Sequence, residues 1–228
     1  MELLLDTINL DEIKRYNKVI ALSGVTSNPT IVKKEGKVAF FDHMRQIRNI
    51  IGDSATLHAQ VVGKTETEML ADAHTIIDKI DSSVFIKVPT NEVGLSVMKT
   101  LKQEGINVTA TAIYTEFQGY LALAAGADYL APYYNRMCNM NIDADRVIQA
   151  LATEIKRTDS NSKILAASFH NVAQVNQAIE NGSQAVTMGP DILASGLGMP
   201  AINQAVTDFS ADWASVYGEG QTVSSLGK

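Results

Sequence analysis

Short apolar runs recur along the chain and alternate with segments whose apolar residues follow helical spacing. Helices are indicated between the runs by the capping box of residues 65–68 and by the apolar face shared within residues 147–155. Gly105 and Gly182 stand where helix C-terminal glycines are expected, just before the next run. The runs with the length and composition of buried strands are LLLD, VIALSGVTSNP, TLHAQVV, VFIKVP, INVTATAIY, ADYLAPYYN, KILAASF and QAVTMGP.

Strict alternation of strands and helices predicts a parallel sheet, either open and doubly wound or closed into a barrel. A doubly wound sheet would place a glycine-rich phosphate turn after the first strand, and the segment DTIN at that point has no glycine. Eight strand–helix units in 228 residues, without a break in composition, favour the closed (β/α)8 TIM barrel. We therefore expect a single α/β domain over residues 1–217, C-terminal helix included, and a flexible tail over residues 218–228.

Composition fits a globular protein and argues against several classes of partner. The net charge is −6, so no general attraction to nucleic acid or to anionic membranes is expected. The single cysteine, Cys138, leaves no internal disulfide, and the absence of a CxxC motif favours the reducing cytoplasm. The N-terminus MELLLDTINLDE is acidic and its apolar run is too short for a signal peptide or membrane span, so we interpret it as a strand.

Polar side chains stand at the predicted C-terminal ends of the strands, where barrels of this type carry their chemistry. The exception is the last strand, which ends in the Met188-Gly189 turn. Lys87 lies within VFIKVP, where a charged amine is costly unless it is paired or loses its proton. A lone lysine there could extend past the strand end or pair with a core carboxylate. A ring of polar residues around it instead predicts a lined pocket, whose members are Asp6, Thr26, Asn28, Gln60, Lys87, Thr111, Tyr133, Arg136 and Ser168.

A buried lysine in such a pocket suits carbon–carbon bond chemistry. Burial lowers the pKa of an amine from its ordinary value of about 10.4, and the freed lone pair can attack a ketone to form a Schiff base. The protonated imine is an electron sink that eases breaking or forming the adjacent carbon–carbon bond. A second group must move a proton, and Asp6, with a water held by Gln60, Thr111 and Tyr133, can do so. The pattern predicts a class I aldolase that needs no metal and no other cofactor.

The chain also resembles a known family, the small transaldolases, in the subgroup of fructose-6-phosphate aldolases. The resemblance runs through LLLDT, GVTSNPT, AQV, IKVP, TATAIY, APYYNR and LAASF, and so covers almost the whole chain. GVTSNPT followed by IKVP at this spacing is highly specific. The resemblance implies a Schiff-base lysine at Lys87, a proton-handling Asp6, substrate-hydroxyl contacts from Asn28 and Thr111, and phosphate binding by Arg136 and Ser168. We also expect Thr26 to bind the substrate.

Two positions bear on the reaction within that family. By resemblance, transaldolases carry a glutamate where this chain has Gln60 and commonly a phenylalanine where it has Tyr133, so both positions match the aldolase pattern. The resemblance thus implies reversible cleavage of fructose 6-phosphate to dihydroxyacetone and glyceraldehyde 3-phosphate. A transaldolase, which transfers the dihydroxyacetone unit between sugar phosphates, is the alternative. A barrel that only binds a phosphosugar is a third hypothesis, and it would need the pocket but not a reactive amine.

Two departures from the family pattern concern the substrate. His170 stands where relatives often have a basic residue, so the phosphate site has less fixed charge. The loop 137–141 is methionine-rich where relatives are often richer in glycine. We expect these positions to affect the range of donors and acceptors.

The remaining candidates have structural interpretations. The histidines lack metal-ligand spacing, and Cys138 has no activating neighbour in the sequence, so we expect structural histidines and an incidental thiol. An apolar stripe, Phe209, Trp213, Val216 and Tyr217, lies near the C-terminus. The resemblance implies ring-shaped homo-oligomers, pentamers or decamers, in which this helix reaches a neighbour. The alternative is an eighth barrel helix that packs on its own subunit.

Overall fold

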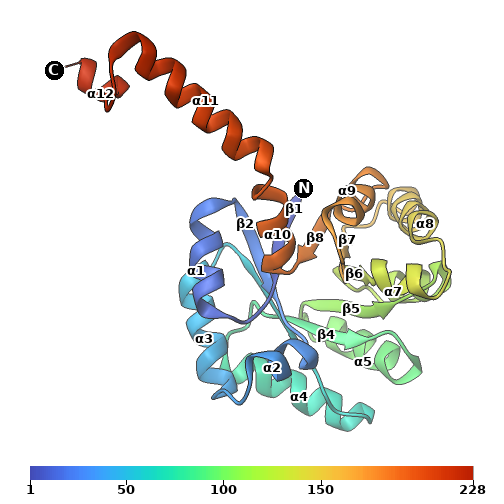
Figure 1. The fold of residues 1–228 in the computed structure, drawn as a ribbon. Coiled ribbons are helices and arrows are strands. Elements are labelled where there is room, and N and C mark those ends of the chain that lie inside the picture. The colour runs from blue at the N-terminus through green and yellow to red at the C-terminus, as the bar shows by residue number, and fades with distance from the viewer. Residues whose placement is uncertain (228) are drawn as a thin grey trace.

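The computed structural model describes residues 1–227 and contains eight parallel strands that close into a barrel in chain order (Figure 1). Pairing of β1 with β8 completes the ring, so the predicted (β/α)8 barrel is confirmed. The strands are β1 (Glu2–Asp6), β2 (Leu22–Thr26), β3 (Thr56–Gln60), β4 (Phe85–Pro89), β5 (Val108–Ile113), β6 (Tyr129–Pro132), β7 (Lys163–Ala166) and β8 (Ala185–Met188).

Helices surround the barrel, and two of the connections, those after β2 and β6, hold a second helix that the alternating pattern did not predict. Three helices follow β8. The helices are α1 (Leu10–Val19), α2 (Pro29–Glu35), α3 (Phe40–Ile51), α4 (Glu66–Lys79), α5 (Glu92–Gln103), α6 (Glu116–Ala124), α7 (Tyr134–Asn139), α8 (Ala144–Arg157), α9 (Val172–Glu180), α10 (Pro190–Leu197), α11 (Pro200–Tyr217) and α12 (Val223–Leu226).

Most strands are shorter than the apolar runs that predicted them, and the difference is largest for β2 and β6. The run that begins at Val19 was predicted as strand throughout, but α1 continues to Val19 because Ile13 and Tyr16 bury its apolar face. The run 127–135 was predicted as one strand, but β6 ends at Pro132 and α7 begins two residues later. Local apolar content does not distinguish a strand end from the first or last turn of a helix.

The barrel has two apolar layers because successive strand residues face opposite sides. Leu5 packs in the layer between strands and helices, whereas its neighbour Leu4 points into the barrel. The interior cluster is small and consists of Leu4, Tyr129, Leu165 and Ala185, with Phe85 packed against it. This cluster fills the N-terminal half of the barrel interior, and the polar side chains at the strand ends lie in the C-terminal half.

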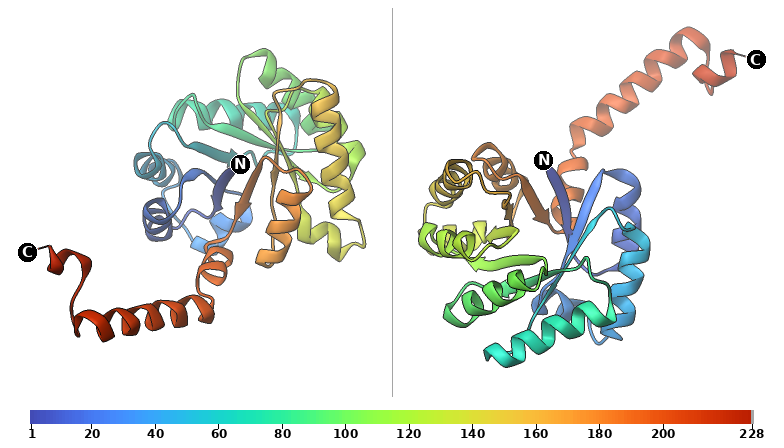
Figure 2. Two further views of the ribbon diagram at one scale, coloured as in Figure 1. Left: turned by 90° about the horizontal axis from the view of Figure 1, so that it is seen from above. Right: turned by 180° about the vertical axis from the view of Figure 1, so that it is seen from behind.

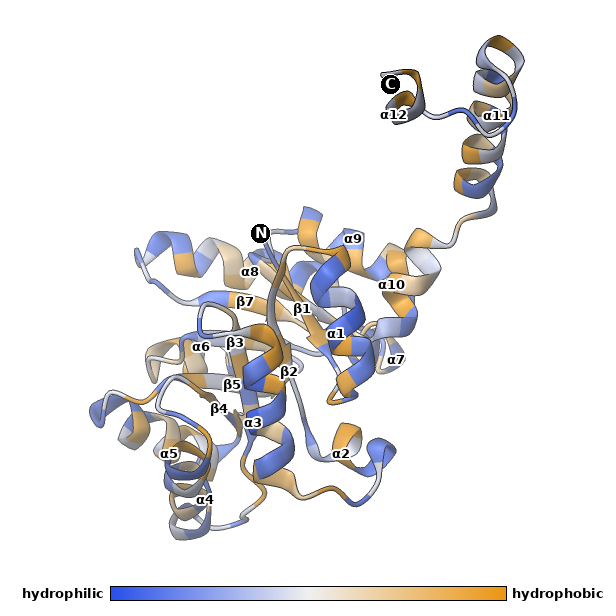
Figure 3. Cartoon of the chain, turned by 90° about the vertical axis from the view of Figure 1, so that its left-hand side faces the viewer, coloured by the Kyte–Doolittle hydropathy of each residue, from blue (hydrophilic) through white to orange (hydrophobic). Residues whose placement is uncertain are grey.

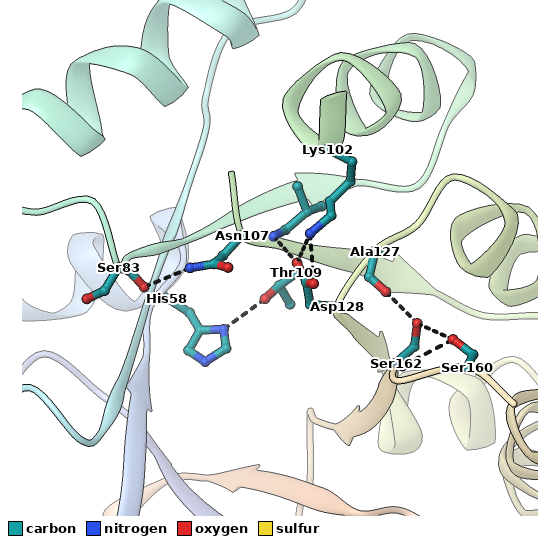
Figure 4. A network of polar contacts seen from close by, with 10 residues as sticks. His58, Ser83, Lys102, Asn107, Thr109, Ala127, Asp128, Ser160 and Ser162 are labelled. Atoms are coloured by element: carbon teal, nitrogen blue, oxygen red, sulfur yellow. Dashed lines mark hydrogen bonds and ion pairs between the residues drawn. The ribbon is translucent and has the colours of Figure 1, made fainter. Parts of the chain in front are cut away.

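Polar contacts connect neighbouring elements at the N-terminal end of the barrel, which is opposite the C-terminal strand ends (Figure 4). The carboxylate of Asp128 accepts hydrogen bonds from Lys102 Nζ at 2.8 and 2.7 Å and from the Val108 amide at 2.7 Å. Ser162 Oγ donates to the carbonyl of Ala127 at 2.7 Å. In barrels of this type such contacts serve stability, whereas the chemistry lies at the other end.

The C-terminal helix leaves the barrel. α10 follows β8 and buries Ile192, but α11 has no buried residue and extends away from the body in every view (Figures 1 and 2). The alternative of a C-terminal helix packed on its own barrel is therefore wrong. α12 lies within the predicted tail, and the last residue of that tail, Lys228, lies outside the described residues. No helix in the described part of the chain has the length and apolarity to cross a membrane.

Candidate active site

Lys87 lies inside the barrel at the middle of β4. Its neighbours Ile86 and Val88 point outward into the apolar layer, so the lysine side chain points inward, and it is only 3% exposed. In the sheet register Lys87 lies beside Gln60 on β3 and Thr109 on β5. Lys87 therefore points into the barrel interior two residues before the C-terminal end of β4.

Lys87 and Asp6 are ionisable side chains in the barrel interior, and each shifts the pKa of the other. Burial lowers the pKa of the Lys87 amine, and the Asp6 carboxylate opposes only part of that shift. Burial also raises the pKa of Asp6, against the opposing effects of Lys87 and of a hydrogen bond from Thr26. None of the salt bridges among the described residues involves either group. The amine is thus shifted toward its neutral, nucleophilic form and the carboxyl toward exchanging a proton.

Two threonine hydroxyls form a chain of hydrogen bonds that ends at Asp6. Thr26 is among the site residues predicted from the sequence, and Thr187 is not. Thr26 Oγ1 donates to Asp6 Oδ1 at 2.6 Å and lies 2.6 Å from Thr187 Oγ1 on β8. The interpretation that β8 ends without a polar side chain was wrong, because Thr187 is the inward residue just before Met188. The sequence indicates this position of Thr187, because every second residue of a strand faces the same side and Ala185 faces inward.

Thr111 and Tyr133 form a second pair. Thr111 Oγ1 lies 2.9 Å from the Tyr133 hydroxyl. The register of β5 shifts after Ala110, where Ala112 adopts a left-handed φ of 59°, so the strand is irregular next to Thr111. Burial raises the pKa of Tyr133, which keeps the phenol protonated and able to donate.

Gln60 is half-buried, and its Oε1 is buried without a hydrogen-bond partner among the described residues. The side chain lies at the edge of a hollow of about 330 Å³ that Asn28, Phe40 and Ile76 also line. The Asn28 carbonyl oxygen Oδ1 accepts from the Ile31 amide at 3.0 Å and so caps α2. Asn28 therefore has a structural role, and its side-chain NH2 group remains available for a ligand.

Arg136 and Ser168 lie on neighbouring loops beyond β6 and β7. Arg136 is exposed on α7, with its guanidinium carbon 4.9 Å from the centre of the Tyr133 ring. Ser168 has a left-handed φ of 62°, and its carbonyl accepts from the Asn135 amide at 2.8 Å, which ties the loop to α7. None of the salt bridges among the described residues includes Arg136. The guanidinium is therefore available to bind an anionic ligand.

The other candidates have structural partners. His43 hydrogen-bonds the carbonyl of Ile8, and His74 pairs with Glu104. No group of three or more potential metal ligands occurs in the part of the chain that the structure describes. Burial and the nearby Asp145 raise the pKa of Cys138, so its thiol is not activated.

Comparison with known proteins agrees with the motifs. A family model described as Transaldolase/Fructose-6-phosphate aldolase matches residues 3–220. A curated protein of Streptococcus pneumoniae (strain ATCC 700669 / Spain 23F-1), named "Probable fructose-6-phosphate aldolase", is 54% identical over 213 residues, which cover 93% of this chain and 96% of that protein.

Proposed function

Because the chain belongs to the transaldolase/fructose-6-phosphate aldolase family, we propose that it is a class I aldolase that reversibly cleaves fructose 6-phosphate to dihydroxyacetone and glyceraldehyde 3-phosphate. The observation that carries this proposal is the inward-facing, 3% exposed amine of Lys87 beside the half-buried Asp6. A protein that only binds a sugar phosphate would bear the cost of a buried amine without using it.

In the proposed reaction the neutral Lys87 amine attacks C2 of the open-chain ketose. Uptake of one proton and loss of water give a protonated imine, and a base removes the proton of the C4 hydroxyl. The C3–C4 bond then breaks, its electron pair moves into the enamine, and glyceraldehyde 3-phosphate leaves. Protonation of C3 and hydrolysis of the imine release dihydroxyacetone and restore the amine. Each proton transfer needs a group that can both bind and release a proton. Asp6 is the carboxyl group that shares the barrel interior with Lys87.

We assign the catalytic water to Gln60, Thr111 and Tyr133. The two hydroxyls lie 2.9 Å apart, and Gln60 has a buried acceptor without a partner among the described residues. Groups of this kind can hold a water that carries protons between Asp6 and the substrate and that later hydrolyses the imine.

Whether the enzyme releases or transfers the three-carbon unit is open to a direct test. Incubation with fructose 6-phosphate alone is expected to yield free dihydroxyacetone, and added erythrose 4-phosphate should not be required. Free product that forms only in the presence of the acceptor would identify a transaldolase instead.

Arg136 is proposed to bind the substrate phosphate together with Ser168. Arg136→Ala is expected to raise the KM for fructose 6-phosphate roughly 10- to 100-fold, as loss of a charged hydrogen bond predicts, and to affect unphosphorylated analogues far less. His170→Ala should have a smaller effect, because an imidazole lacks the paired donors with which a guanidinium binds phosphate. Arg146→Ala, which removes an exposed arginine from α8, is the matched control. Equal effects of Arg136→Ala on both kinds of substrate would rule out the phosphate role.

A homo-oligomer is proposed from the exposed apolar residues of α11 and α12. Phe209, Val216 and Val223 are between 70% and 76% exposed, and hydrophobic positions recur along α11 where it stands clear of the barrel (Figure 3). Apolar side chains on a helix that does not reach its own barrel are typical of a contact with a second copy of the chain.

Removing residues from Phe209 onward is expected to reduce the mass of the particle in solution to that of smaller assemblies or monomers. Size-exclusion chromatography with light scattering measures this change. Far-ultraviolet circular dichroism must show an intact barrel. An unchanged assembly would mean that α11 does not join the subunits.

A further inference from the structure

A compact group of three rings lies in the barrel on the N-terminal side of Lys87. Phe85 precedes Lys87 by two residues on β4 and therefore faces the same interior. The His58 ring stacks on Phe85 with centroids 4.8 Å apart and an interplanar angle of 20°, and it meets Tyr129 edge-on at 5.2 Å. Phe85 and Tyr129 are themselves 5.1 Å apart. Each ring thus contacts both of the others.

His58 is fixed in this group by both of its ring nitrogens. Nδ1 lies 2.8 Å from Thr109 Oγ1 (Figure 4), and Nε2 lies 2.9 Å from Thr56 Oγ1. The side chain has no exposed surface. Thr56 Oγ1 donates to the Ser23 carbonyl and can accept from Nε2, and the Thr109 hydroxyl can donate to Nδ1. The two threonines therefore satisfy a neutral imidazole and set the plane in which it stacks on Phe85.

The three rings separate two charged regions of the barrel interior. Toward the C-terminal ends lie Lys87 and Asp6. Toward the N-terminal ends, the Tyr129 hydroxyl donates to Glu2 at 2.7 Å, and Glu2 pairs with Lys163. Apolar side chains of the interior cluster complete the layer at the level of the rings.

We propose that His58, Phe85 and Tyr129 form an aromatic floor that keeps water from the Lys87 amine on the N-terminal side, and that His58 is the positioning residue that closes this floor. The proposal rests on the proposed function, since it explains how Lys87 is kept ready to react. Burial is the main cause that lowers the pKa of Lys87, and the floor is the part of the surroundings that a single substitution can open.

Few titratable groups face Lys87, so a change in its pKa after a substitution in the aromatic floor can be attributed to the entry of water. The titratable groups that face it are Asp6 from β1, His58 from β3, and Tyr129 and Tyr133 at the two ends of β6. Burial, with the positive charges of Lys87 and Arg48, holds the pKa of His58 well below its ordinary value, so the ring is neutral. β2, β5 and β8 present threonine hydroxyls, and β7 presents Leu165.

His58→Ser is expected to open the floor. The space left by the ring would be lined by the new hydroxyl and by those of Thr56 and Thr109, and a polar space of this size takes up water. Water beside the amine stabilises its charged form, so the pKa of Lys87 should rise by about one unit. The acid limb of the pH profile of kcat/KM should move to higher pH by the same amount. His58→Phe fills the space with another ring and should leave the limb near its original position.

Two measurements test the proposal: the pH profile of fructose 6-phosphate cleavage, and a ¹³C NMR titration of the Lys87 side chain assigned by its loss in Lys87→Met. The titration needs no turnover, so it tests the floor even if the proposed reaction is wrong, which absence of cleavage by the unaltered protein would show. His74→Ser removes an exposed histidine and is the matched control.

An unshifted Lys87 titration in folded His58→Ser would overturn the proposal. So would a loss of activity at every pH in His58→Phe, because the imidazole itself would then be required. If His58→Ser does not fold, Phe85→Ala opens the same floor from β4 and is expected to shift the titration in the same direction.

Discussion

Lys87→Met is expected to abolish cleavage of fructose 6-phosphate, with a loss of more than about 10⁴-fold in kcat, because no other group can supply the imine. The fold should persist. The folded state holds the amine's proton less tightly than the unfolded chain does, so protonation favours unfolding, and replacing the amine removes that cost. The melting temperature at neutral pH should therefore hold or rise.

The matched control for this substitution is Lys99→Met, which makes the same chemical change at an exposed position of α5. It should leave kcat unaltered. Near-normal activity of Lys87→Met would remove the Schiff-base proposal, and unfolding of the variant would remove the argument that the amine is a cost to stability.

Tyr133→Phe is expected to move the enzyme from release of dihydroxyacetone toward its transfer. The substitution deletes the hydroxyl that lies 2.9 Å from Thr111 Oγ1 and keeps the ring. If that hydroxyl holds the water that protonates C3 of the enamine, release of free dihydroxyacetone should fall about 10²-fold, the usual scale for one positioned proton-handling group. In transfer the enamine carbon attacks erythrose 4-phosphate instead of taking up that proton, so transfer should fall much less.

Tyr114→Phe provides the control, because the Tyr114 ring lies 5.7 Å from Tyr133 and loses the same hydroxyl. Its ratio of transfer to release should stay constant. Parallel losses of both reactions in Tyr133→Phe would show that the hydroxyl acts mainly in a step that both reactions share, imine formation or imine hydrolysis, and would contradict this account.

The barrel and the position of Lys87 could be predicted because both follow from short-range patterns. Alternation of apolar runs with helical spacing requires parallel strands, and an inward lysine between Ile86 and Val88 follows from the two-residue period of a strand. The same period also places Thr187 inward, although the last residue of β8, Met188, is apolar. Strand limits near Val19 and Pro132 depend on which helix face becomes buried, and that is a property of the tertiary structure.

Other features could not be found in one sequence. The pairing of His58 with Phe85 and Tyr129 joins β3, β4 and β6, and the register between strands is set by the closure of the barrel. The apolar stripe of α11 was visible, but the pattern is the same for a helix that packs on its own barrel and for one that contacts another chain. Only the three-dimensional arrangement excluded the first.

The central claim is that Lys87 forms a covalent imine with the ketose, and borohydride reduction tests it most directly. The protein is incubated with fructose 6-phosphate or dihydroxyacetone, reduced, digested and analysed by mass spectrometry. We predict a stable adduct on the peptide that contains Lys87 and no adduct in the Lys87→Met protein. Active enzyme that yields no adduct, or an adduct confined to another lysine, would contradict the claim.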